Sequence, residues 1–122
     1  MRFARWTFLI AGVYGILVIL PLFFAEQQMN TLFPPAINHP EYYYGFAAVA
    51  LAWQFLFLLI AREPLRLRPA MLPAILEKIP YGLAVMVLYM QGRVSSSLLL
   101  TAAIDLLLGI LFIVAFWRTR RQ

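Results

Sequence analysis

Four long apolar runs dominate the 122-residue sequence and constrain its fold more than any other feature. They cover residues 5–24, 42–61, 69–90 and 96–117. A helix needs about 20 predominantly apolar residues to cross the ~30 Å hydrocarbon core of a bilayer, and each run reaches that length. The sequence therefore predicts an all-α integral membrane protein, a four-helix bundle that forms a single transmembrane domain over residues 1–122.

The composition excludes several classes of function. Hydrophobic residues make up 64% of the chain and charged residues 12%, against roughly 45–50% and about 25% in soluble domains, so lipid is the expected solvent. The chain has no cysteine and one histidine, which excludes disulfides, thiol–disulfide chemistry and a multi-histidine metal site. We expect no metal and no cofactor. The net charge of +5 comes from basic residues at the ends of the apolar runs, which predicts membrane topology and no nucleic-acid partner.

The third run is the least regular because it contains three prolines and two charged residues. These are Pro69, Pro73, Glu77, Lys78 and Pro80. A loop outside the membrane is the alternative, but three helices would then leave the termini on opposite sides and residues 83–90 in water. We therefore predict a transmembrane helix kinked by proline.

The arginines predict the orientation of the bundle. Eight lie at the ends of the runs that share a side with the termini, and only Arg93 lies on the other side. Basic residues stay preferentially in the cytoplasm, so we predict N-in/C-in topology in the cell inner (plasma) membrane. Residues 25–41 and 91–95 would then face outward, the first as an extended strap containing Pro34 and Pro35.

Six polar side chains are predicted to lie in one layer within the membrane. At 1.5 Å per residue they fall ~10–18 Å from the cytoplasmic ends of their helices. They are Tyr14, Gln54, Glu77, Lys78, Tyr81 and Asp105. Ionisable groups inside a membrane are costly and usually face the bundle interior with partners. Ala11 and Gly15 add a pair of small residues that permits close helix approach.

This layer has two interpretations. In the first, Lys78 neutralises an acid and the layer only fixes how the helices pack; Asp105 is the preferred partner, because Glu77 is adjacent to Lys78 and points ~100° away. In the second, two acids against one lysine leave a surplus carboxyl group. That group could be protonated, or could bind a cation or a polar head group.

The outward rim offers weaker candidates. His39 and Glu41 are too few to complete a metal site and are predicted to be a solvated pair. Three consecutive tyrosines, residues 42–44, are typical of the aromatic belt at a membrane interface, as are Trp6 and Trp117 at the opposite side.

The chain resembles small four-helix bacterial inner-membrane proteins near the DoxX-like group. The resemblance rests on His39-Pro40-Glu41-Tyr42, Leu51-Ala52-Trp53-Gln54, Arg62-Glu63-Pro64, Leu76-Glu77-Lys78 and Asp105-Leu106-Leu107. Some members of that group are implied to act together with quinone-linked oxidoreductases. The resemblance assigns no functional residue to this chain. Small multidrug transporters are similar in size but bury a glutamate in their first helix, where this chain is uncharged between Arg5 and Glu26.

Two functional hypotheses follow. The first is a non-enzymatic membrane protein, either a partner subunit or a binder of a lipophilic molecule such as a lipid or quinone, built on the polar layer. Its partners would be the lipid bilayer and a membrane protein or further copies of this chain. The alternative is a small proton-coupled carrier or membrane enzyme that uses Glu77 or Asp105. No catalytic residue is assigned.

Overall fold

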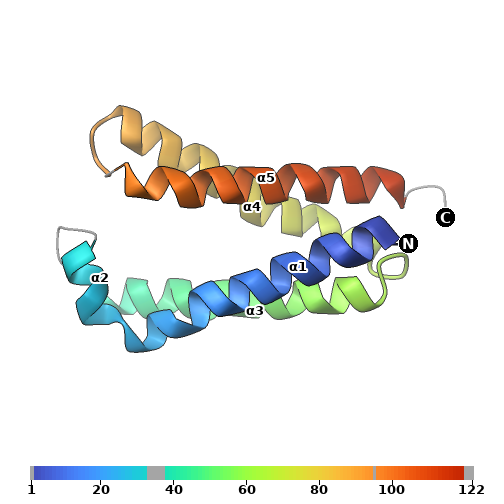
Figure 1. Cartoon of the computed structure of the whole chain (residues 1–122), viewed down its shortest axis with the longest axis horizontal. Helices are drawn as coiled ribbons and strands as arrows, with labels where there is room; N and C mark the ends of the chain where they lie inside the picture. The colour runs from blue at the N-terminus through green and yellow to red at the C-terminus, as the bar shows by residue number, and fades with distance from the viewer. Residues whose placement is uncertain (1, 33–37, 95, 120–122) are drawn as a thin grey trace.

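The computed structural model describes residues 2–32, 38–94 and 96–119, and these residues form helices joined by short turns, with no strand (Figure 1). Four helices are long and apolar enough to cross a membrane, at Arg2–Phe24, Pro40–Arg62, Arg68–Met90 and Leu98–Arg118. The protein is therefore a multi-pass membrane protein, and the predicted four-helix bundle is confirmed with its ends shifted by only a few residues.

The first span changes helix type near its end. Helix α1 (Arg2–Ile19) continues into the 3₁₀ helix η1 (Leu20–Phe24), which contains Pro21. Proline has no backbone N–H and so cannot continue the α-helical ladder, which explains the tighter turns. A short helix, α2 (Glu26–Leu32), follows. The predicted extended strap is therefore wrong over these residues, whose polar side chains favour a surface helix; Pro34 and Pro35 lie outside the described residues.

The third span is helical despite its prolines. Helix α3 (Pro40–Arg62) leads through η2 (Arg68–Ala70) to α4 (Met71–Met90). Pro69 and Pro73 lie in the first turns, where a backbone N–H has no partner within the helix, so their cost is small. Pro80 lies inside α4, which runs on through it. The helix is confirmed, and its kink stays a prediction.

The helices pack as two pairs. Helix α1 lies along α3, α4 lies along α5 (Ser97–Arg118), and α1 also contacts α5 (Figure 1). Both termini lie at one end, here called the terminal end, and α2 and the α4–α5 turn lie at the other, the loop end. The pairs diverge toward the loop end, and α3 and α4 meet over only a short stretch.

A core shared by all four helices fills the half of the bundle near the terminal end. Phe8 and Phe112 stack with ring centroids 4.2 Å apart, and Phe57 meets the Phe112 ring edge-on at 5.0 Å. Small and aliphatic residues complete it: Ala4, Ala11, Ile60, Ala61, Met71, Ala74, Leu108 and Ala115. Alanines permit close helix approach. Because the members of this core lie at the middle of their membrane spans or nearer the terminal end, the bundle converges there.

Glycines bring the members of each pair together. A methyl group at Gly15 of α1 would collide with the Gln54 side chain of α3, and one at Gly82 of α4 would lie 2.6 Å from Leu106 of α5. Ala11 is fully buried one turn from Gly15. The small-residue face predicted on the first helix is therefore the face that packs against its partner.

We expect Gly15→Ala to destabilise the bundle by about 1–3 kcal/mol, because the added methyl group overpacks the α1–α3 interface. Gly45→Ala is the matched control, since a Cβ at Gly45 meets nothing within 4 Å. This control should be neutral or slightly stabilising, as alanine is the better helix former. The measurement is the free energy of unfolding in mild detergent, and equal effects of the two substitutions would contradict the packing described.

Candidate functional site

Lys78 is the centre of a charged triad inside the bundle. Its Nζ lies 3.5 Å from Glu77 Oε1 on α4 and 3.5 Å from Asp105 Oδ1 on α5. The predicted pairing of Lys78 with Asp105 is therefore present, but the predicted preference for Asp105 over Glu77 is not, because the lysine lies equally close to both acids. Its flexible four-carbon stem bridges the angle between neighbouring positions of one helix.

The triad is largely removed from the membrane surroundings. Lys78 is buried, and the Glu77 and Asp105 side chains are only 20% and 19% exposed. The Lys78 Nζ also lies 5.4 Å from the centroid of the Phe57 ring, a distance at which the ring attracts a cation. The triad thus rests on the aromatic core and, with both acids ionised, carries one surplus negative charge.

Two buried polar atoms of the described residues lack a hydrogen bond. One is Glu77 Oε1, whose neighbour is the Lys78 ammonium, and the other is Gln54 Oε1. The Gln54 Nε2 donates to the Ala50 carbonyl oxygen at 2.8 Å. Buried polar atoms in proteins are nearly always bonded, so each exception requires an explanation.

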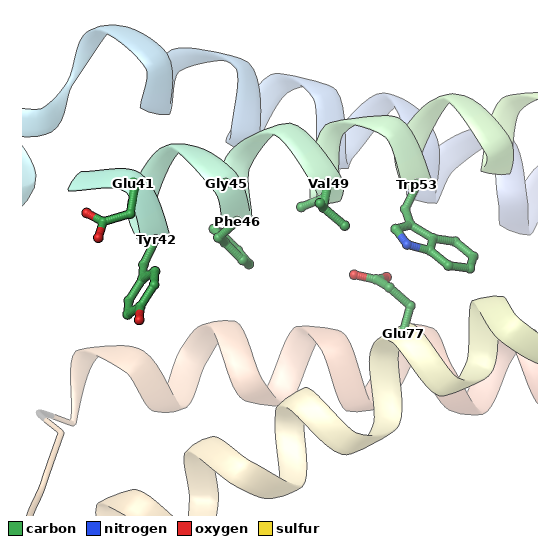
Figure 2. A pocket seen from close by; sticks show the side chains of 8 residues that line it. Glu41, Tyr42, Gly45, Phe46, Val49, Trp53 and Glu77 are labelled. Carbon is green, nitrogen blue, oxygen red and sulfur yellow. The ribbon is translucent and has the colours of Figure 1, made fainter. Parts of the chain in front are cut away.

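A cleft of about 480 Å³ opens between α3 and α4 on the loop-end side of the triad. Figure 2 shows Glu77 reaching from α4 across this α3–α4 cleft toward Trp53 of α3. Its other lining residues come from α3: Glu41, Tyr42, Gly45, Phe46, Val49 and Ala50. The cleft is therefore an open, apolar and partly aromatic space with one carboxylate at each end.

The structure divides the predicted polar layer into two parts. Glu77, Lys78 and Asp105 form the triad, and Tyr14 is half-buried within electrostatic range of Asp105. Gln54 instead lies in the α1–α3 interface against Gly15. Tyr81 is half-buried one turn from Glu77 and forms no hydrogen bond or ion pair with the described residues.

Sequence reasoning missed the aromatic wall of the cleft. Tyr42, Phe46, Val49 and Trp53 follow one another at intervals of four, three and four residues, which places them on one stripe of α3. This spacing was visible in the sequence. In a membrane helix, however, the lipid-facing residues are equally apolar, so the stripe alone does not indicate a cleft.

Two tyrosines hold α3 at the loop end. The Tyr43 hydroxyl donates to the Leu22 carbonyl oxygen, and the Tyr44 hydroxyl donates to Glu26 Oε1 at 2.9 Å. These contacts join α3 to η1 and to the start of α2, in addition to any role in the predicted aromatic belt. They fasten the helix that forms the aromatic wall of the cleft.

The histidine at the loop end pairs with a neighbouring carboxylate. His39 Nδ1 lies 3.5 Å from Glu41 Oε2, both side chains are more than half exposed, and His39 stacks on Tyr42. In the described part of the chain no three potential metal ligands gather. The pair is solvent-exposed, as the sequence predicted.

Comparisons with models of protein families, with curated proteins and with solved structures found no match for this chain. The DoxX-like resemblance therefore stays a prediction.

Proposed function

We propose that this membrane protein is a non-enzymatic binder of a lipid-like amphiphile, which it holds in the α3–α4 cleft with a positively charged, hydrogen-bond-donating head group against Glu77. The observation that carries the proposal is the Glu77 carboxylate. It lines the cleft, and its buried Oε1 is ion-paired with Lys78 Nζ at 3.5 Å but has no hydrogen bond. Because Glu77 shares that lysine with Asp105, a ligand N–H group in the cleft would add a donor to an acid that is only partly compensated.

The charge of the triad supports a cationic head group. Asp105 shares Lys78 with Glu77 but does not line the cleft, so the charges that a ligand meets are those of Glu77 and, at the loop end, Glu41. A buried acid without full compensation is costly in a membrane, and an ammonium group would offset that cost. Quinone oxygens only accept hydrogen bonds and complement an ionised carboxylate poorly.

The walls of the cleft support an amphiphile over a small polar solute. The Trp53 ring lies beside Glu77 in Figure 2, so a head group at Glu77 would also lie next to an aromatic side chain. From Trp53 to Tyr42 the lining of α3 is apolar or aromatic over ~16 Å of helix, long enough to cover part of a hydrocarbon chain. Mostly apolar walls with a few polar groups are typical of ligand sites.

The test is native mass spectrometry of the protein purified in mild detergent. We expect an amine-bearing amphiphile to co-purify with the natural chain and to be lost from Val49→Trp, which fills the cleft. Val114→Trp is the matched control because Val114 is an exposed valine of α5 outside the cleft. Equal retention by both variants, or retention of only a protein neighbour, would overturn the proposal.

We also propose that the protein resides in a bacterial inner membrane with both termini in the cytoplasm. The support for the orientation is the eight-to-one distribution of arginines in the sequence, with only Arg93 between the third and fourth spans.

This orientation predicts the result of a labelling experiment on single-cysteine variants, which the cysteine-free chain makes simple. Gln28→Cys on the exposed side of α2 and Gln122→Cys at the C-terminus should react from opposite sides of intact inverted vesicles. Gln122 should be the accessible one, because the cytoplasmic side faces out in such vesicles. Labelling of only the Gln28→Cys variant would indicate the opposite orientation. Labelling of both variants would contradict the number of membrane crossings.

A further inference from the structure

A second depression lies on the lipid-facing surface between α1 and α5. This α1–α5 groove has a volume of about 360 Å³ and lies near the terminal end. It is lined by Arg2, Phe3, Trp6, Thr7, Ile10, Leu108 and Leu111. From Arg2 to Ile10 it follows α1 for ~12 Å, close to the thickness of one hydrocarbon leaflet.

The rim of this groove carries positive charge without acidic partners. Arg2 lines the groove, and the Arg118 guanidinium of α5 lies 4.8 Å from the ring centroid of Phe3, another lining residue. Both arginines are exposed. Among the described residues neither has a carboxylate partner, whereas Arg66 pairs with Glu63 at 2.9 Å.

The groove also has the depth profile of a lipid site. Trp6 is 58% exposed, and such tryptophans usually lie at the level of the lipid head groups. The arginines lie on the terminal side of Trp6, where phosphate groups would be. Ile10 and Leu108 lie on its other side, where an acyl chain would be.

We propose that the α1–α5 groove binds an anionic phospholipid, with its phosphate between Arg2 and Arg118 and an acyl chain along Ile10 and Leu108. Basic residues near a membrane surface attract anionic lipids. A second copy of this chain is a poor occupant, because it would bring the same unpaired arginines against this rim. The site is independent of the α3–α4 cleft, whose surplus charge is negative.

The test compares phosphatidylglycerol with phosphatidylcholine of the same acyl chains, each added to the delipidated full chain and followed by native mass spectrometry. We expect phosphatidylglycerol to bind more tightly. Arg2→Gln/Arg118→Gln should weaken it by roughly tenfold or more, as expected for loss of two surface charges, and leave phosphatidylcholine unchanged.

Two further variants separate a built site from general attraction. Arg62→Gln/Arg66→Gln removes the same charge from the same end but outside the groove, and should keep the preference for phosphatidylglycerol. Ile10→Trp keeps both arginines but fills the path of the acyl chain. This variant should lose the preference for phosphatidylglycerol. Equal losses in the two double variants, or full binding by Ile10→Trp, would overturn the proposal.

Discussion

Lys78→Met is expected to destabilise the bundle by about 3–5 kcal/mol, because removing the cation from a buried ion pair leaves its acidic partners uncompensated. Here two carboxylates, Glu77 and Asp105, lose their shared ammonium group at once. The measurement is the free energy of unfolding in mild detergent. The matched control is Arg66→Met, whose pair with Glu63 is exposed and therefore worth at most about 1 kcal/mol.

Second-site changes test whether the lysine is truly shared. Lys78→Met/Glu77→Gln and Lys78→Met/Asp105→Asn each leave one buried carboxylate, so each should recover only part of the lost stability. The triple variant, with both acids neutralised, should recover most of it. If one double variant alone restores full stability, the carboxylate that this variant keeps does not need Lys78. The lysine would then pair with only one acid, which contradicts the two equal distances of 3.5 Å.

The second large effect concerns binding. Glu77→Gln is expected to weaken binding of a long-chain alkylammonium probe by about tenfold or more, because a hydrogen bond to a charged group contributes about 1.5–3 kcal/mol. Trp53 is a natural reporter, since it lines the cleft. The chain has three tryptophans, and the double variant Trp6→Phe/Trp117→Phe keeps only Trp53. Its fluorescence would be followed while dodecylammonium is added to the protein in nanodiscs.

The shape of this titration separates binding from partitioning into the bilayer. We expect a saturable response to dodecylammonium and only a gradual one to dodecyl sulfate of the same chain length. Glu63→Gln is the control variant, because it removes a carboxylate at the terminal end, outside the cleft. It should bind like the parent, and a gradual response to both probes in every variant would contradict a specific site.

The sequence predicted the helices well because their physics is local. A helix in lipid must satisfy its own backbone and span the hydrocarbon, so length and hydropathy locate it without knowledge of its neighbours. The third run illustrates this: Pro69 and Pro73 discouraged the prediction of a helix, yet both lie in its first turns, where proline is tolerated.

The arrangement of the helices was much less predictable. In a membrane both the lipid-facing and the core-facing sides are apolar, so the pattern of apolar residues does not say which helices pair. Pairing depends instead on close contacts such as Gly15 with Gln54 and Gly82 with Leu106. The first contact draws Gln54 into the α1–α3 interface and away from the triad, although the depth estimate had grouped it with Lys78.

The α3–α4 cleft illustrates the same limit. Glu77 was a candidate from the sequence because an ionisable group in a membrane needs a reason. Trp53 was not, because one more aromatic residue in an apolar helix carries no signal by itself. The divergence of the two helix pairs toward the loop end opens the cleft that both side chains line, and this divergence is a feature of the packing (Figures 1 and 2).

Photolabelling tests the central claim most directly, because it reports which residues a bound amphiphile touches. The probe would be a long-chain alkylammonium with a diazirine close to its head group, activated in nanodiscs and mapped by mass spectrometry. We expect labels concentrated on the α3 wall near Val49 and Trp53 and on α4 near Glu77, and fewer of them in the Val49→Trp variant. Labels spread evenly over the lipid-facing residues of all four spans would contradict the claim.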